Sequence, residues 1–193
     1  MTNRIRQRRL LVAAFLLGAV LLAGTSVTGV RAQGQSENEF RAGAATSNVT
    51  PKLGTSMNGL FHERHADHVH DELHARALFL DNGQTRFAFV VVDNCLIPRE
   101  IFDEAKQQVH EKIDLPVDHM LMSATHTHSA ATATPVFLAN PDPEYLDYLT
   151  SKIADAVKLA HNNLQPAEIG WGTGEVPEET FNRRWYMKEG TIP

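Results

Sequence analysis

The order of strand-like and helix-like segments is the feature that most constrains the fold of this chain. Two apolar runs, at 86–93 and 118–125, have the length and composition of buried strands. The segment between them, 98–113, carries its apolar residues on one helical stripe and begins with proline, which suits the first turn of a helix. A strand, a helix and a second strand in this order predict a right-handed crossover between parallel strands.

The rest of the sequence extends this pattern into an α/β domain. Asn82-Gly83 is a strong signal for a two-residue hairpin, so we expect the strand before it to pair antiparallel with 86–93. The other elements that we expect are strands at 40–45, 72–81 and 168–173 and a long helix at 143–164. The last helix and strand predict a second parallel crossover. The sequence therefore predicts an α/β fold with a mixed sheet, parallel crossovers and helices packed on the sheet.

The N-terminus has the pattern of a secretory signal peptide. Residues 1–32 combine four early arginines, an apolar core and small residues before a cleavage point near Gln33. We expect a secreted or periplasmic protein, with an uncleaved membrane anchor as the alternative. Residues 33–39 then form a polar lead-in, and 40–193 form one α/β domain that is long enough for a real core.

Charge and cysteine content exclude several classes of function. Removal of residues 1–32 takes away five arginines and no acidic residue, which leaves 13 basic against 23 acidic residues and a net charge of −10. An acidic protein without a basic block is not expected to bind nucleic acid. Cys95 is the only cysteine, which rules out an internal disulfide, and its place after an apolar run predicts a buried side chain.

Two histidines stand two residues apart where the second apolar run stops. In an extended backbone, side chains at i and i+2 lie on one face, so His126 and His128 can point at one metal ion. Histidine nitrogen is a good zinc ligand at neutral pH. If the strands at 86–93 and 118–125 are parallel neighbours, Asp93 lies at the same rim of the sheet as the two histidines. It could then bind the metal or orient a histidine. The alternatives are that both histidines are solvated at the end of a strand, and that Asp93 caps a helix or fixes a loop.

A histidine-rich loop is the rival site. His62-Glu63 begins like a metalloprotease helix, but Ala66 stands where that motif needs its second histidine. We therefore interpret the middle of the loop as solvated, and we keep His62 and His74 as candidates for the rim of a substrate site. The middle histidines are His65, His68 and His70.

The segment around the paired histidines resembles the neutral/alkaline non-lysosomal ceramidases. Segment 121–129 is similar to the Ser-Ala/Gly-Thr-His-Thr-His-Ser stretch of that family and is the specific part of the likeness. Other segments agree in order: an opening strand and turn at 42–51, a strand with Arg-Ala at 73–80, an apolar strand that ends in aspartate at 89–93, and an Asn-Arg element at 181–183. The sequence departs from the family where Ala130-Ala131 replaces the usual Gly-Pro.

The resemblance implies a zinc-dependent amide hydrolase that cleaves an N-acylsphingosine into a fatty acid and sphingosine. It implies that His126 binds Zn²⁺, that His128 is an active-site partner, and that Arg183 binds the substrate or the developing oxyanion. A lipid-like amide is then the substrate, and contact with a membrane surface stays open. The alternatives are a hydrolase of the same fold that acts on another amide or ester, and a secreted non-catalytic metal-binding or interaction domain.

The resemblance also implies that the sequence is the N-terminal portion of a longer protein. The family's remaining zinc ligands, a histidine, a glutamate and a tyrosine, lie downstream of the segments that match, so the fragment alone is expected to be inactive. We expect the missing C-terminal portion of the same protein to dock on this domain. Where that portion is absent, the domain should expose an apolar patch.

Overall fold

The structure, a computed structural model, describes residues 39–182 and 184–191. The predicted signal peptide at 1–32 and nearly all of the predicted lead-in lie outside the described residues, so both stay predictions. Within the described part of the chain, no helix is long and apolar enough to cross a membrane.

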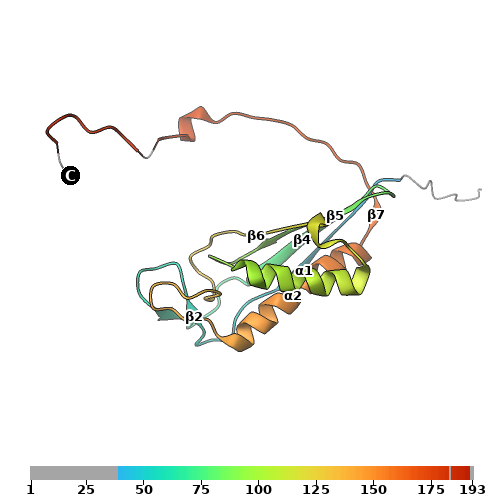
Figure 1. Cartoon of the computed structure of the whole chain (residues 1–193), viewed down its shortest axis with the longest axis horizontal. Coiled ribbons are helices and arrows are strands. Elements are labelled where there is room, and N and C mark those ends of the chain that lie inside the picture. The colour runs from blue at the N-terminus through green and yellow to red at the C-terminus, as the bar shows by residue number, and fades with distance from the viewer. Residues whose placement is uncertain (1–38, 183, 192–193) are drawn as a thin grey trace, which may run out of the picture. The chain divides into compact units, whose positions relative to one another are not determined.

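A five-stranded mixed sheet forms the centre of the domain (Figure 1). The strands lie in the order β6, β5, β4, β1 and β7 across the sheet. They comprise Arg41–Asn48 (β1), His74–Asp81 (β4), Arg86–Val92 (β5), Met120–Ala124 (β6) and Gln165–Pro166 (β7). The helices are Arg99–Ile113 (α1) and Pro143–Asn162 (α2), with short 3-10 turns at Val117–His119 (η1) and Pro177–Glu179 (η2). A separate two-stranded sheet joins Ser56–Met57 (β2) to Arg64–His65 (β3).

The central crossover has the predicted form. β5, α1 and β6 follow one another, and β5 pairs with β6 in parallel, from Ala88 opposite Met120 to Val92 opposite Ala124. β4 pairs antiparallel with both β1 and β5, so the sheet is mixed as predicted. The carboxyl ends of β5 and β6 therefore open on one rim of the sheet.

The predicted second parallel crossover and the predicted strand at 168–173 are both wrong. β7 covers only Gln165–Pro166, and it pairs antiparallel with β1 at the edge of the sheet opposite β6. Residues 168–173 alternate apolar side chains with glycine, which suits a strand, but no described strand pairs with them, and every described residue from 168 to 191 is exposed. A strand-like sequence pattern is not enough to form a strand, because an extended backbone also needs the edge of a neighbouring strand for its hydrogen bonds.

The hairpin between β4 and β5 is longer than predicted. Asp81 is opposite Arg86, so the connection has four residues, 82–85, rather than two. The side-chain oxygen of Asn82 accepts hydrogen bonds from the backbone N–H groups of Gln84 and Thr85, at 3.0 and 2.7 Å. This side-chain turn replaces the tight backbone turn that Asn-Gly usually makes.

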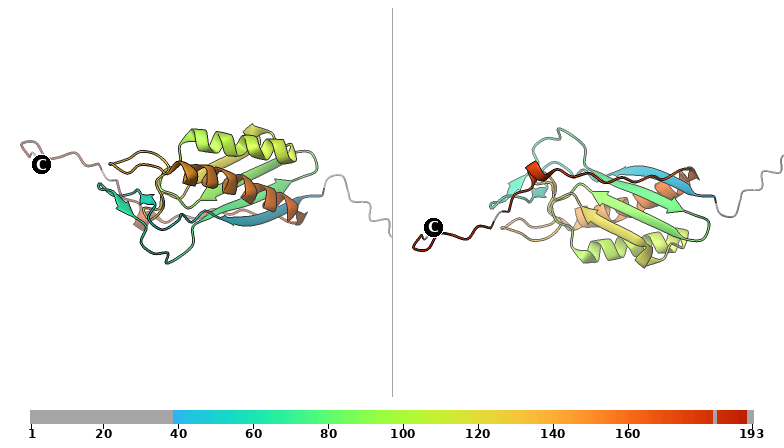
Figure 2. Two further views of the ribbon diagram at one scale, coloured as in Figure 1. Left: turned by 90° about the horizontal axis from the view of Figure 1, so that it is seen from below. Right: turned by 90° about the horizontal axis from the view of Figure 1, so that it is seen from above.

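Both helices cover the same face of the sheet (Figure 2). The side chains that alternate along β4 and β5 on this face are buried, and they are Ala75, Ala77, Phe79, Ala88, Val90 and Val92. α2 comes very close to β1, because a Cβ added to Gly43 would lie 2.1 Å from the backbone oxygen of Ala160. A glycine at this point of β1 lets the helix and the strand touch through their backbones.

The opposite face of the sheet is apolar and exposed. We call it the open sheet face, and it consists of Leu78, Phe87, Phe89, Val91 and Leu121. These side chains are 39% to 64% exposed, and they adjoin one another, since Leu78 is opposite Phe89 and Phe89 is opposite Leu121. A contiguous patch of large apolar side chains is unusual on a monomer. The exposed apolar patch that the sequence predicts is thus present on the sheet.

Candidate functional site

The paired histidines lie in the loop that follows β6. β6 ends at Ala124, and His126 has a backbone φ of 64°, so this segment is not extended as predicted. A left-handed backbone is uncommon for a residue with a Cβ. The N–H groups of Thr125 and His126 donate to the carbonyl oxygens of Val92 and Asn94, at 2.9 and 3.0 Å, and fix this conformation. The loop is therefore held by the end of β5.

The two imidazoles lie close together as predicted, but a left-handed backbone at His126 brings them together rather than an extended strand. Nε2 of His126 lies 3.3 Å from Nε2 of His128, with the two rings edge to face. Nδ1 of His126 lies 2.8 Å from the carbonyl oxygen of Cys95. Because a carbonyl oxygen only accepts hydrogen bonds, Nδ1 carries the proton and Nε2 keeps its lone pair. His126 is thus prepared to bind a metal ion through Nε2.

The geometry of this pair fits a zinc ion. With Zn–N bonds of about 2.0–2.1 Å and tetrahedral angles, two nitrogen ligands of one zinc lie about 3.3–3.4 Å apart. The observed distance of 3.3 Å between the two Nε2 atoms matches this expected separation of two zinc ligands. Cys95 lies near this pair, and one possible ligand atom from each of the three residues lies within 4.8 Å of the other two. The described residues therefore bring one sulfur and two nitrogens together.

Cys95 is a member of this cluster that the sequence analysis missed. Its side chain is buried, as predicted, and burial raises the pKa of the thiol above its usual value. Its Sγ lies 3.8 Å from Nδ1 of His126. The parallel pairing of β5 with β6 creates this contact, because both residues follow the carboxyl ends of neighbouring strands.

His128 is held by the histidine-rich loop that the sequence analysis treated as a rival site. Arg64 in β3 donates a hydrogen bond from Nη2 to the carbonyl oxygen of His128. Gly59 has a φ of +103°, and a Cβ added there would lie 2.6 Å from Cβ of His128. The N–H of Thr132 also donates to the Ser56 carbonyl of β2, at 2.8 Å. The small β2–β3 sheet thus forms one wall of the site.

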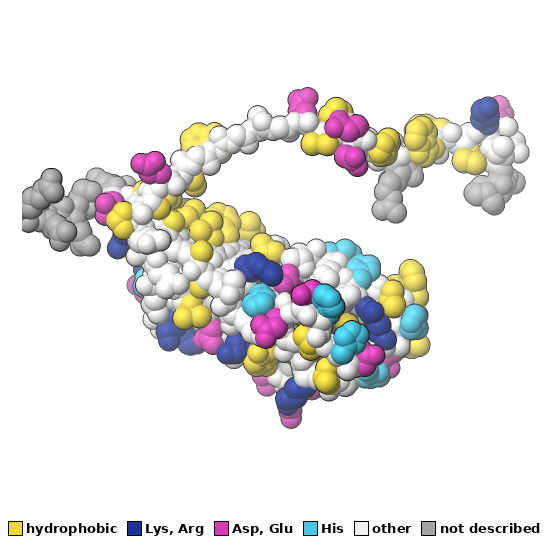
Figure 3. Space-filling model, turned by 180° about the vertical axis from the view of Figure 1, so that it is seen from behind, with side chains coloured by type: hydrophobic (Ala, Val, Ile, Leu, Met, Phe, Trp, Pro, Cys, Tyr) yellow, Lys and Arg dark blue, Asp and Glu magenta, His cyan; other side chains and the backbone are white. Residues whose placement is uncertain are grey.

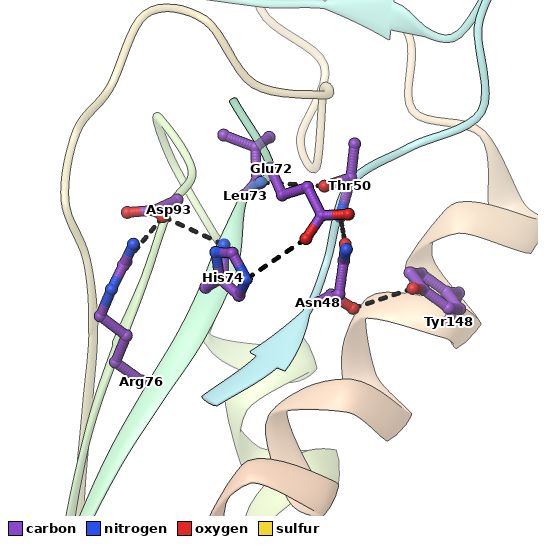
Figure 4. A network of polar contacts seen from close by, with 8 residues as sticks. All are labelled: Asn48, Thr50, Glu72, Leu73, His74, Arg76, Asp93 and Tyr148. Atoms are coloured by element: carbon purple, nitrogen blue, oxygen red, sulfur yellow. Dashed lines mark hydrogen bonds and ion pairs between the residues drawn. The ribbon is translucent and has the colours of Figure 1, made fainter. Parts of the chain in front are cut away.

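Asp93 contacts β4 rather than the imidazoles. Its Oδ2 accepts hydrogen bonds from the backbone N–H of His74, at 3.0 Å, and from Nη1 of Arg76, at 2.6 Å (Figure 4). Nε2 of His74 lies 3.7 Å from Oε2 of Glu72 in the same network. These contacts are those of an aspartate that fixes the loop and the start of β4. The supporting role of Asp93 at the metal site therefore stays a prediction.

A cavity of about 700 Å³ lies beside the paired histidines. Thr127 and Ser129 of the histidine loop line it together with the three solvated histidines, His65, His68 and His70. Histidine and acidic side chains gather on this face of the molecule (Figure 3). Two of the acidic groups pair with neighbouring histidines: Asp67 with His68 at 2.6 Å, which lowers the pKa of Asp67, and Asp71 with His70 at 2.8 Å.

Asp93 lines this cavity, whereas neither His126 nor His128 is among the described residues that line it. His62 and His74, the two rim candidates, are not among the described residues that line it. Arg183 lies outside the described residues, so its role stays a prediction. The cluster that the structure assembles therefore consists of Cys95, His126 and His128.

Known proteins share the sequence pattern around this cluster. Residues 40–187 match the family described as neutral/alkaline non-lysosomal ceramidase, N-terminal. Neutral ceramidase A of Dictyostelium discoideum is 29% identical over an alignment of 133 residues, and the match covers 61% of this chain and 18% of that protein. Neutral ceramidase B of the same organism is 28% identical over an alignment of 130 residues, and the match covers 60% of this chain and 17% of that protein.

A solved structure shares the fold. The crystal structure of neutral ceramidase from Pseudomonas aeruginosa matches 67% of this chain and 22% of its own chain, with a TM-score of 0.61 and 19% sequence identity. The chain therefore spans about a fifth of the length of these relatives. Since the family match covers most of the sequence, the chain belongs to the neutral/alkaline non-lysosomal ceramidases and corresponds to the N-terminal domain of that family.

Proposed function

We propose that this chain is the N-terminal part of a zinc-dependent hydrolase that cleaves an N-acylsphingosine into a fatty acid and sphingosine. Membership of the family supports the hydrolase class. The neutral ceramidases among its relatives support a lipid-like amide as substrate. The observation that carries the proposal is the separation of 3.3 Å between two imidazole Nε2 atoms, which suits one metal ion.

The proposed roles of the two histidines follow from their contacts, and that of Arg183 follows from the family resemblance alone. His126 binds the metal through Nε2, because its Nδ1 proton is committed to a carbonyl oxygen. His128 presents Nε2 to the same point and positions the metal or the substrate. A bound zinc ion would supply a Lewis acid that lowers the pKa of water and polarises the substrate carbonyl. Arg183 would place a fixed positive charge where the oxyanion develops.

An apolar tip beside the histidine pair supports a lipid substrate. Leu60 and Phe61 follow the glycine that contacts His128, and Phe61 packs edge to face on Phe137, with ring centroids 4.7 Å apart. Phe61 and Leu138 are 84% and 81% exposed. Large apolar side chains at exposed loop tips suit insertion among acyl chains. We therefore propose that this tip contacts the acyl chain or the membrane surface that presents it.

The test combines metal content with product release. Wild type and His126→Ala are loaded with zinc and dialysed, and we expect about one zinc per chain in the wild type and almost none in the variant. Fatty-acid release is then measured from soluble short-chain ceramide and from ceramide in phospholipid vesicles, with the longest protein that the reading frame encodes. We expect release that zinc chelation abolishes. Thr127→Ala is the control, because Thr127 lies between the two histidines in the sequence but supplies no ligand nitrogen.

Each other outcome of this test selects an alternative. Zinc retained unchanged in His126→Ala contradicts the ligand assignment. Release from an ester or from another amide, with none from ceramide, identifies a hydrolase of the same family with a different substrate. Zinc bound without release from any of these substrates identifies a non-catalytic metal-binding domain.

We propose that the open sheet face is covered by a further part of the same protein, which corresponds to the portion of its relatives that this chain does not span. The chain spans about a fifth of those proteins, and an exposed sheet of large apolar side chains is suited to packing against another layer. Leu121→Lys should therefore lower the unfolding temperature of the longer protein and leave that of residues 33–193 almost unchanged. The measurement is thermal unfolding of both proteins with and without the substitution. Equal small effects in both proteins would show that the face stays uncovered.

A further inference from the structure

We propose that the two-residue turn Phe137-Leu138 is a membrane anchor, whose apolar side chains insert into the surface layer of a phospholipid bilayer. The inference rests on the proposed function and deepens it, because it names a bilayer, rather than the acyl chain of the substrate, as the partner of this turn. A bilayer bound here would bring a lipid-like amide to the side of the domain that carries the paired histidines.

The backbone of this turn is strained. Phe137 and Leu138 both have a positive φ, of 50° and 74°. Val136 and Ala139 close the turn around them, with hydrogen bonds of 3.3 and 3.0 Å between their N–H groups and carbonyl oxygens. A two-residue turn with two positive φ values is usually made by Asn-Gly, because a bulky side chain disfavours the left-handed backbone. Phenylalanine and leucine are therefore poor residues for the fold of this turn.

The exposure of the two side chains indicates why they stand there. Backbone strain persists where another requirement outweighs it, often at functional sites. Packing within the domain is not that requirement for Leu138, because its side chain is 81% exposed. Phe137 is 52% exposed and contacts Phe61 edge to face, which joins the turn to the histidine-rich loop in one apolar tip. The large side chains of this turn therefore serve a contact outside the domain.

The shape of the tip favours a bilayer over a further layer of protein. The loop that carries the turn projects beyond the first residues of α2 (Figure 2). A narrow projection offers a second protein layer little area, whereas a few large apolar side chains can enter the boundary between lipid headgroups and acyl chains. The open sheet face, by contrast, is a contiguous surface of the kind that packs against another layer.

The tip is close to the paired histidines. Gly59 contacts His128, since a Cβ added to Gly59 would lie 2.6 Å from Cβ of His128. Leu60 and Phe61 follow Gly59 directly, and Phe61 is the residue that contacts Phe137. An anchor at Phe137 is therefore joined to His128 through a short segment of the histidine-rich loop.

The charge of the chain determines which lipids this anchor suits. From residue 33 on, the chain has 13 basic and 23 acidic residues and a net charge of −10, so anionic lipids would not attract it. Insertion of apolar side chains needs no anionic lipid. We therefore expect binding to phosphatidylcholine vesicles that high salt leaves almost unchanged, because no long-range charge attraction is screened.

Vesicle flotation tests the anchor, with the longest protein that the reading frame encodes from residue 33 on. The double variant Phe137→Asn, Leu138→Gly carries the residues that this turn prefers, so it should keep the turn and melt no lower than the wild type. Its affinity for phosphatidylcholine vesicles should fall at least about tenfold, because two large apolar side chains are lost. Leu138→Asn alone, which preserves the contact between Phe137 and Phe61, should weaken binding about threefold or more.

Leu159→Gln is the matched control. It also removes an apolar side chain, one that is 45% exposed, but on α2 rather than in the turn, and it should bind vesicles as the wild type does. Activity gives a second readout. In the double variant, the ratio of fatty-acid release from vesicle ceramide to release from soluble short-chain ceramide should fall about tenfold.

The outcomes separate the anchor from its alternatives and from the proposed function. A wild type that does not float with the vesicles, or a folded double variant that binds them equally well, overturns the anchor. A marked fall of the melting temperature in both variants of Leu138 shows that protein covers the turn, and an equal loss of release from both substrates assigns the turn to the acyl chain; either result rejects the bilayer. If only the double variant fails to bind vesicles and no protein releases fatty acid, the anchor stands and the proposed function fails.

Discussion

Gly43→Ala should destabilise the domain by about 3 kcal/mol, because the new methyl group has no space. Its Cβ would lie 2.1 Å from the backbone oxygen of Ala160 and 2.9 Å from the backbone of Asn163 and Leu164. Backbone atoms cannot rotate aside as a side chain can, so α2 must move away from β1. Urea unfolding measures the loss, and the melting temperature should fall by roughly 6–12 °C.

Ala44→Val is the matched control for this substitution. Ala44 is the next residue of β1, and its side chain is exposed on the open side of the sheet. A β-branched residue suits a strand, so this change should alter the free energy of unfolding by less than about 0.5 kcal/mol. Equal effects of Gly43→Ala and Ala44→Val would contradict the close packing of α2 on β1.

The centre of the sheet could be predicted from sequence because its signals are local. The apolar runs that become β5 and β6, and the helical stripe that becomes α1, lie within one continuous segment. Their order fixes a parallel pair through the handedness of the crossover. The edge at β7 could not be predicted in this way. Its pairing with Arg41 and Ala42 depends on where α2 returns the chain, and no local pattern encodes that position.

β5 shows why the open sheet face is hard to predict residue by residue. Its sequence, Arg86–Val92, is almost continuously apolar, which is typical of a strand buried on both faces. The structure buries Ala88 and Val90 beneath the helices and leaves Phe87 and Phe89 exposed. A sequence pattern reports which side chains prefer burial. It cannot report whether a covering layer is present.

The residues of the candidate site likewise fall into those that the sequence could predict and those that it could not. The spacing of His126 and His128 predicts that they meet, and they do. Cys95 could have been found by the argument that places Asp93 at the rim, since Cys95 also follows β5 and β5 is the parallel neighbour of β6. Gly59 carries no such signal. Its contact with His128 exists only because a loop without periodic pattern folds against another loop.

Gly59→Ala should reduce zinc affinity by about tenfold to 100-fold without removing any ligand atom. The added Cβ would lie 2.6 to 2.8 Å from Cβ, Cα and Cγ of His128, so the imidazole must move away from Nε2 of His126. A tetrahedral site tolerates little change in the separation of two nitrogens that are already 3.3 Å apart. Competition for zinc with a chelating dye, on folded protein, measures the affinity.

Gly54→Ala is the control that separates this steric effect from backbone strain. Both glycines have a left-handed backbone, with φ values of +87° at Gly54 and +103° at Gly59, so the backbone strain of an alanine costs about 1 kcal/mol of stability at either position. A Cβ at Gly54, however, meets no atom within 4 Å. We therefore expect Gly54→Ala to lose only this amount of stability in urea unfolding and to bind zinc as the wild type does. Gly59→Ala should lose more stability, because of the added contact with His128, and should also bind zinc more weakly. Equal zinc affinity in the two variants would show that the position of His128 does not govern the metal, and His126 would then have to bind it without this partner.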